Sequence, residues 1–321
     1  MRPYKPLPSV EYFLKSLPSR HAITIQRTMK LTSLYLRISA TDTTNQATNL
    51  FRALTLLFVT CMCFGPAAAA PALPESTPLV IGETWFIDSQ VLGEKRRINV
   101  YRPAGVPADA ALPVLYMPDG GLTEDFLHVA GLLQVGAANM TMRAFLLVGV
   151  ENTERRRDLT GPTAVAKDRS IAPRVGGSQA FRDFIRNELM PQVARRYRVT
   201  AERAIVGESL GGLFVVETLV REPDLFDTYI ALDPSLWWND GALLKQVSAQ
   251  PLTLSRQKNL YIGSSADGQS FIDQPVLAAT FGETENLHFD FESWPTETHA
   301  TIYHPAALKA FRLMLGTQGS R

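Results

Sequence analysis

The stretch Gly207-Glu208-Ser209-Leu210-Gly211-Gly212 decides how this chain folds. An apolar run at residues 203–206 precedes it and another at residues 213–216 follows it, which predicts a strand, a sharp turn and a helix. Glycine stands two positions before and two positions after the serine, where a tight turn leaves no room for larger side chains. We therefore expect Ser209 at the apex of the turn, with its hydroxyl above the end of a sheet.

Gly-x-Ser-x-Gly between a strand and a helix is the nucleophile elbow of α/β-hydrolases. The strained turn exposes the Ser209 hydroxyl, and the N-terminus of the following helix favours negative charge that develops beside it. The bare pattern also arises by chance in a chain with this glycine content, so the flanking strand and helix carry the assignment. Ser209 is the expected nucleophile.

The composition indicates a globular protein without nucleic-acid chemistry. The chain has 321 residues, 20% charged and 45% hydrophobic, with a formal net charge of +1. These values are typical of a soluble protein with a substantial core. Residues 1–70 hold eight Lys or Arg and two Asp or Glu, which leaves 24 basic and 29 acidic residues in the remainder. A weakly acidic body without basic clusters argues against nucleic acid as a partner.

Residues 1–70 are predicted to be an N-terminal extension that ends in a secretory signal peptide. An apolar region at about residues 53–65 follows Arg52, and the alanines at 68–70 form an A-x-A cleavage pattern. We expect cleavage near Ala70, a periplasmic or secreted protein, and no stable membrane insertion afterwards. The rival interpretation is an uncleaved anchor, for which the apolar core is short. Met29 is an alternative to Met1 as the true start.

The cysteines restrict the possible chemistry of the mature chain. Cys61 and Cys63 are the two cysteines of the sequence, and both lie in the predicted leader. The expected mature chain, residues 71–321, therefore has no disulfide, no thiol nucleophile and no cysteine-ligated metal. We also expect no metal or organic cofactor, because the sequence lacks a Gly-x-x-x-x-Gly-Lys loop and paired metal-ligand histidines. Serine chemistry is the main nucleophilic option left.

From about residue 79 onward, apolar runs of strand length alternate with stretches of helical spacing. A charged turn at residues 93–97 predicts an antiparallel N-terminal hairpin. Further strands are expected at residues 112–117, 144–150, 203–206, 228–232, 259–263 and 287–291. Helices are expected at residues 124–138, 180–197, 210–219 and 306–315. This alternation predicts a single α/β-hydrolase domain over residues 71–321, with a mostly parallel central sheet and helices on both faces.

A serine hydroxyl needs a base within hydrogen-bond reach, and α/β-hydrolases present serine, acid and histidine in that chain order. His299 and His304 follow the last predicted strand. His299 is the expected base and His304 the fallback. The acid is expected in the loop after the strand at 259–263, where Asp267 is nearest to the strand end. A Ser-His dyad is one alternative, and the other candidate acids are Asp273, Glu283 and Glu285.

Acyl transfer also needs two preorganised N–H donors for the oxyanion. The backbone of Leu210, the residue after the nucleophile, is expected to supply one donor. The other is expected from Gly120 or Gly121, which follow the strand that ends at Met117. Glycine there would let the backbone approach a substrate, although the same residues also suit a plain turn.

Taken together, these motifs resemble the esterase D-like putative esterase family, which includes enterochelin, salmochelin and ferri-bacillibactin esterases. The matching pieces occur in the family's order between residues 80 and 315. They are Tyr116-Met-Pro-Asp-Gly120, Val148-Gly-Val-Glu-Asn-Thr153 with Arg157-Asp158, the elbow, Asp233-Pro-Ser-Leu-Trp-Trp-Asn239 and Glu297-Thr-His-Ala300.

The resemblance implies a serine carboxylic-ester hydrolase with Ser209 and His299 as nucleophile and base. Arg157 and Trp237 would lie near the substrate pocket. A small-molecule ester is the implied partner, either a catecholate siderophore trilactone or another small or carbohydrate-linked ester. The alternatives are an acyltransferase of the mycolyltransferase type and an inactive ligand-binding homologue.

Two departures from the family pattern stand out. Many relatives carry Glu in the loop where Asp267 is proposed as the acid. Asp233 stands where serine is frequent, which is expected to alter the edge of the pocket.

Overall fold

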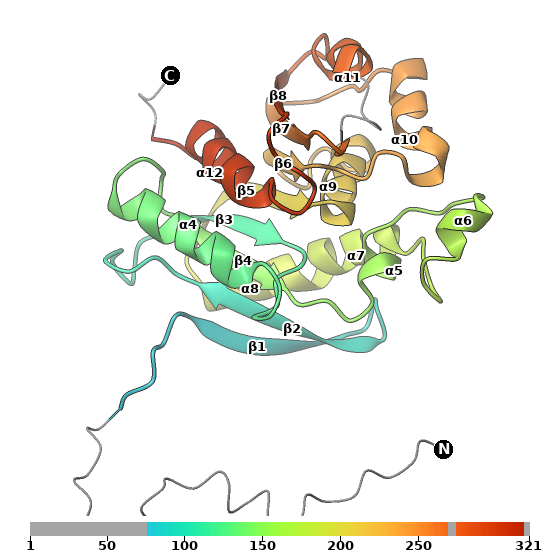
Figure 1. Ribbon diagram of the computed structural model, residues 1–321. Coiled ribbons are helices and arrows are strands. Elements are labelled where there is room, and N and C mark those ends of the chain that lie inside the picture. Colours follow the sequence, from blue (N-terminus) through green and yellow to red (C-terminus); the bar gives the residue numbers. More distant parts are fainter. Residues whose placement is uncertain (1–75, 269–273, 318–321) are drawn as a thin grey trace, which may run out of the picture. The chain divides into compact units, whose positions relative to one another are not determined.

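The computed structural model describes residues 76–268 and 274–317 (Figure 1). The chain divides into two units, Met1–Thr77 and Pro78–Arg321, and the second holds every strand and helix described below. The predicted signal peptide and its cleavage site near Ala70 lie outside the described residues. Within the described ranges, no helix combines the length and the apolar character that a membrane crossing requires.

Eight strands form one sheet in the order β1-β2-β4-β3-β5-β6-β7-β8. The first pairings, β1 with β2 and β2 with β4, are antiparallel, and all the others are parallel. The strands are β1 (Glu83–Ser89), β2 (Glu94–Tyr101), β3 (Leu112–Met117), β4 (Leu146–Val150), β5 (Val199–Glu208), β6 (Thr228–Leu232), β7 (Lys258–Ser265) and β8 (Leu287–Trp294). The predicted α/β-hydrolase class and the antiparallel N-terminal hairpin are confirmed.

Helices cover both faces of the sheet (Figure 1). One face carries α4 (Phe126–Ala138) and α12 (Tyr303–Met314). The opposite face carries α7 (Ser178–Phe184), the π-helical turn η1 (Ile185–Leu189), α8 (Met190–Arg196), α9 (Leu210–Arg221), α10 (Trp238–Ala249) and α11 (Gln274–Phe281). Two single-turn helices, α5 (Arg155–Asp158) and α6 (Ala166–Arg169), lie in the connection between β4 and α7.

Side-chain alternation along the strands produces two cores. In β3, Val114 and Tyr116 belong to the core under α9, whereas Leu115 and Met117 belong to the core under α4 and α12. All four side chains are buried, as expected for a strand that is covered on both sides. The strands of the sequence are continuous apolar runs because both faces of the sheet are buried under helices.

The structure differs from the sequence prediction mainly in the helices. The helix predicted at residues 180–197 is continuous but contains the π-helical turn η1 in its middle. Helices α10 and α11 had no clear sequence signal. In α10 the backbone is left-handed at Asn239, Asp240 and Gly241, which interrupts any helical periodicity near its start.

Candidate active site

Ser209 occupies the predicted turn between β5 and α9. Its backbone has φ +59° and ψ −119°, a strained conformation for a residue with a side chain. A Cβ on Gly207 would lie 2.5 Å from the carbonyl of Gly211, so the first glycine of the motif is required by contact within the turn itself. A Cβ on Gly212 would lie 3.0 Å from Pro234 Cα. The missing side chain therefore lets the segment after β6 pack closely on α9.

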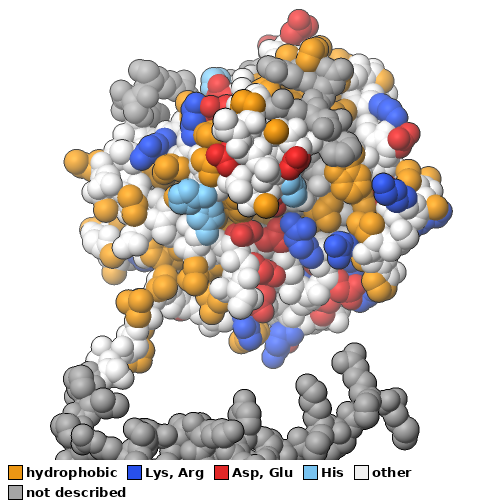
Figure 2. All heavy atoms as spheres, viewed as in Figure 1, with side chains coloured by type: hydrophobic (Ala, Val, Ile, Leu, Met, Phe, Trp, Pro, Cys, Tyr) orange, Lys and Arg blue, Asp and Glu red, His pale blue; other side chains and the backbone are white. Residues whose placement is uncertain are grey.

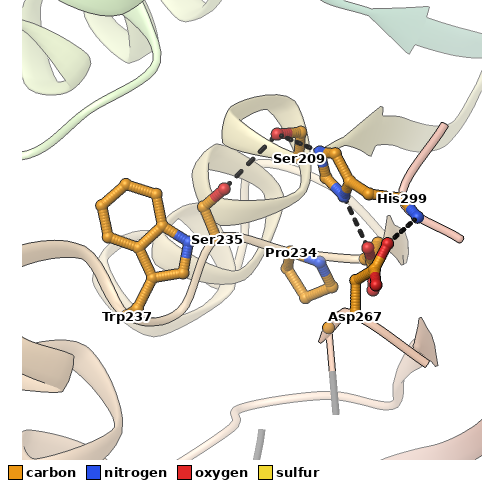
Figure 3. A pocket seen from close by; sticks show the side chains of 8 residues that line it. Ser209, Pro234, Ser235, Trp237, Asp267 and His299 are labelled. Atoms are coloured by element: carbon orange, nitrogen blue, oxygen red, sulfur yellow. Dashed lines mark hydrogen bonds and ion pairs between the residues drawn. The ribbon is translucent and has the colours of Figure 1, made fainter. Parts of the chain in front are cut away.

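His299 lies in the loop between β8 and α12 and faces the serine (Figure 3). Its Nε2 is 3.0 Å from Ser209 Oγ, and its Nδ1 is 2.5 Å from Asp233 Oδ2. A carboxylate can only accept, so Nδ1 carries the proton and Nε2 is free to accept the hydrogen bond that the Ser209 hydroxyl donates. The imidazole is therefore in the tautomer that a general base requires.

Asp233, the carboxylate on this imidazole, comes directly after β6. Its side chain is 1% exposed and also accepts hydrogen bonds from the N–H and the hydroxyl of Ser265, both at 2.8 Å. Burial alone would raise the pKa of Asp233, but the hydrogen bonds from His299 and Ser265 lower it below its usual value. The hydrogen bond to Asp233 raises the pKa of His299. The group next to the imidazole is thus an ionised carboxylate at neutral pH.

The prediction that Asp267 is the acid is wrong, because a different aspartate contacts the imidazole ring. Asp267 Oδ2 accepts the backbone N–H of His299 at 3.0 Å and does not bond to the ring. It holds the loop that carries the base, while Asp233 contacts the imidazole. Glu283 and Glu285 precede β8 and so lie at the opposite end of the parallel strands from Ser209, and Asp273 lies outside the described residues.

The other predicted histidine has a different partner. His304 Nδ1 lies 2.9 Å from His128 Nε2, so His304 pairs with another imidazole rather than with the serine.

The sequence analysis also missed Ser235, whose Oγ is 3.4 Å from Ser209 Oγ. Its N–H donates to the carbonyl of Ser209 at 3.0 Å, which ties the segment after β6 to the elbow.

Of the predicted oxyanion donors, the structure leaves only Leu210 available. Leu210 is the first residue of α9, and its N–H has no acceptor among the described residues. The N–H of Gly120 donates to the carbonyl of Val150 at 3.0 Å, and that of Gly121 donates to Glu124 Oε2 at 2.6 Å. The assignment of Gly120 and Gly121 is therefore wrong in this structure. A Cβ on Gly120 would lie 2.3 Å from Gly149 Cα, so the glycine is needed for backbone packing.

The structure separates the two predicted substrate contacts. Trp237 is 38% exposed and lines a cavity of about 250 Å³ together with Ser209 and His299 (Figure 3). Arg157, by contrast, donates to Glu94 at 2.7 Å and to Asp158 at 2.6 Å, and it does not line that cavity. The Arg157 guanidinium is thus held by carboxylates of the protein and does not face the cavity beside Ser209. Across the described part of the chain, no group of three or more His, Cys, Asp or Glu side chains is arranged to hold a metal ion.

Residues 89–307 match the protein family described as "Putative esterase". The chain belongs to this family. It is 35% identical over 169 residues to ferri-bacillibactin esterase BesA of Bacillus subtilis, a match that covers 48% of this chain and 58% of the relative. It is 32% identical over 190 residues to the siderophore triacetylfusarinine C esterase of Aspergillus fumigatus, covering 55% of this chain and 63% of the relative. These matches span less than two thirds of either relative.

Solved structures share the fold. An IroE-like serine hydrolase from Shewanella oneidensis superposes with a TM-score of 0.65 at 26% identity, over 73% of this chain and 80% of that protein. Siderophore hydrolase EstB from Aspergillus nidulans superposes with a TM-score of 0.63 at 23% identity, over 77% of this chain and 98% of that protein. The family resemblance inferred from the motifs is confirmed.

Proposed function

We propose that this protein is a serine ester hydrolase that works through an acyl-enzyme. The single observation that carries the proposal is the continuous hydrogen-bonded line from Ser209 Oγ through His299 to Asp233, with contacts of 3.0 and 2.5 Å. A buried carboxylate, an imidazole and a hydroxyl in this order form the arrangement that activates serine on several unrelated folds.

In the first half of the reaction, Ser209 Oγ attacks the ester carbonyl carbon while His299 Nε2 takes the hydroxyl proton. Asp233 holds the proton on Nδ1 and stabilises the imidazolium that results. The Leu210 N–H and the N-terminus of α9 stabilise the oxyanion. The tetrahedral intermediate then collapses, the carbon–oxygen bond to the alcohol breaks, and the alcohol leaves with the proton from Nε2.

In the second half, His299 takes a proton from water, and the resulting hydroxide adds to the acyl carbon. Collapse of this intermediate releases the carboxylic acid and returns the proton to Ser209. The net reaction converts the ester and one water molecule into the carboxylic acid and the alcohol.

For the substrate, we propose a siderophore ester. The support is that the relatives' names, ferri-bacillibactin esterase and siderophore triacetylfusarinine C esterase, refer to esters of this kind. The half-exposed Trp237 in the cavity beside the nucleophile supports a substrate with a flat or apolar part that can contact an indole ring.

We also propose that the protein acts after export, on the strength of the basic leader and the apolar segment before Ala70. Cell fractionation followed by N-terminal sequencing tests this proposal. An N-terminus near Pro71 on the exported protein is expected, and an intact leader on cytoplasmic protein would contradict it.

Hydrolysis of p-nitrophenyl acetate and butyrate by the purified protein tests the reaction class. Activity should fall at least about a hundredfold in Ser209→Ala and in His299→Ala. Activity that survives Ser209→Ala would contradict the proposal.

A second assay follows ferric and iron-free siderophore lactones by chromatography, with and without added alcohol. Free acid as the product supports a hydrolase, whereas ester transferred to the alcohol indicates an acyltransferase.

A further inference from the structure

Two cavities share His299. One, described above, holds Ser209 and Trp237. The other has a volume of about 470 Å³, and the nucleophile does not line it. Its titratable lining residues are Asp125, His128, Glu208, His299, Tyr303 and His304. Figure 2 shows histidine and acidic side chains gathered near the centre of this face of the molecule.

The position of Nε2 relates the second cavity to the alcohol part of the substrate. In ester cleavage the departing alcohol oxygen must lie within hydrogen-bond reach of the imidazole nitrogen that protonates it. That nitrogen is His299 Nε2, because Nδ1 is bound to Asp233. Glu208 Oε1 lies 3.4 Å from the same Nε2. An alcohol oxygen within hydrogen-bond reach of Nε2 is therefore close to Glu208, which lines the second cavity.

Glu208 lies next to the nucleophile and is largely buried. It stands between Gly207 and Ser209 at the end of β5, and its side chain is 16% exposed. The Arg155 guanidinium donates to the backbone carbonyl of Glu208 at 3.4 Å, but the two carboxylate oxygens of Asp119 bind it at 2.6 and 2.9 Å and offset its charge. Of the described residues that line the second cavity, none is Lys or Arg.

We propose that the second cavity is the subsite for the alcohol part of the ester, and that Glu208 makes it select alcohols by charge. An alcohol that carries a cationic group is favoured, a neutral alcohol is accepted, and an anionic alcohol is disfavoured. This inference rests on the proposed esterase function. Among siderophore esters, it favours the neutral ferric hydroxamates over the trianionic ferric catecholates.

The charge of the cavity depends on pH in a defined direction. Burial raises the pKa of Glu208 to about 7, against the lowering effects of His299 and Arg155. Burial also raises the pKa of Asp125 to about 6, helped by Asp119 and Glu124 and opposed by Arg155. Glu208 is therefore largely neutral at pH 6, where Asp125 is about half ionised, and both carboxylates are largely ionised at pH 8.

Apart from the base His299, two further lining groups have shifted pKa values. Burial lowers the pKa of His128, with a further contribution from His304, which favours its neutral form. Burial raises the pKa of Tyr303 well above its usual value, so the phenol keeps its proton. The acidic character of the cavity thus increases between pH 6 and pH 8.

The test compares three acetate esters on the full-length protein. They are the esters of choline, of its neutral isostere 3,3-dimethylbutanol, and of 3-hydroxypropanoate, with p-nitrophenyl acetate as the reference. At pH 8 we expect kcat/KM for the choline ester to exceed that for the anionic ester by at least about tenfold beyond the ratio of their alkaline hydrolysis rates. The ratio of kcat/KM for the choline ester to that for the anionic ester should be smaller at pH 6. All esters use the same base, so the loss of activity caused by protonation of His299 cancels from this ratio.

Variants assign the effect to the cavity. Glu208→Gln should reduce the cation-to-anion ratio at pH 8 to within about twofold of the alkaline hydrolysis ratio, and Asp125→Asn should reduce it partly. Glu285→Gln, which removes an exposed carboxylate at the opposite end of the sheet, should leave the ratio unchanged. Equal ratios in the parent and in Glu208→Gln would overturn the inference while Ser209-dependent hydrolysis of the reference ester still upheld the esterase. Absence of hydrolysis of every ester would overturn both.

Discussion

The imidazole of His299 is bound by Asp233, a carboxylate that lies 66 positions earlier in the chain and at the end of a different strand from the one expected. Asp233 follows β6, the neighbour of the strand that carries the nucleophile, so acid and serine lie on adjacent strands of the sheet. Ser265, at the end of β7, donates two hydrogen bonds to the same carboxylate. Three neighbouring strand ends therefore build the site.

Asp233→Asn should abolish most of the activity. The amide would keep the size of the side chain, but it would no longer stabilise the imidazolium or select the tautomer with the proton on Nδ1. We expect kcat for p-nitrophenyl acetate to fall by about a thousandfold or more. Asp267→Asn, which affects only the hydrogen bond to the His299 backbone, should cost about tenfold or less. The reverse order of the two variants would return the acid role to Asp267.

The pH profile should show an acidic limb that belongs to His299. The hydrogen bond to Asp233 raises the pKa of this imidazole, so the base is protonated and inactive below an inflection that lies above the usual histidine value of about 6.5. Activity is therefore gained as pH rises through the inflection. We expect Asp233→Asn to move the inflection of kcat/KM to lower pH. An inflection that stays in place in this variant would contradict the assignment.

The first glycine of the elbow should be sensitive to a single methyl group. In Gly207→Ala the new Cβ would approach the Gly211 carbonyl to 2.5 Å, and we expect the free energy of unfolding to fall by about 1–3 kcal/mol. Gly131→Ala is the matched control, because nothing lies within 4 Å of a Cβ at this position in α4. It should stabilise the protein by up to about 1 kcal/mol. Chemical denaturation of both variants measures the difference.

Arg157 should contribute to stability rather than to substrate binding. Its guanidinium bonds Glu94 and the buried Asp158, and removal would leave these carboxylates with fewer partners. We expect Arg157→Ala to lower the free energy of unfolding by about 1–3 kcal/mol, with KM for p-nitrophenyl butyrate changed less than about twofold. An unchanged unfolding free energy together with a large rise in KM would favour the substrate role that the family resemblance implies.

Much of the scaffold was predictable because its signals are local. The strands predicted at residues 112–117 and 228–232 have the same bounds in the structure, since short apolar runs with turn residues at their ends specify buried strands. Ser209 and His299 were also predictable. The elbow is a single continuous motif, and the base lies in the loop after the last strand of the fold.

The acid could not be read from the sequence in the same way. Two strands end with an aspartate nearby, Asp233 after β6 and Asp267 after β7, and both come within hydrogen-bond distance of His299, one on the ring and one on the backbone. Only the three-dimensional path of the loops distinguishes them. The one available signal was that Asp233 departs from the family at a position where serine is frequent. The hydrogen bond from the Gly120 N–H to Val150 at the end of β4 likewise depends on tertiary packing that no local pattern encodes.

Covalent labelling with a fluorophosphonate measures whether His299 activates Ser209. The reagent phosphonylates a serine only when a base removes its proton. Mass spectrometry of the digested protein should find the label on the peptide that contains Ser209, and nowhere in Ser209→Ala. The rate of labelling should fall at least about a hundredfold in His299→Ala. Label on another residue, or undiminished labelling in Ser209→Ala, would show that Ser209 is not the activated nucleophile.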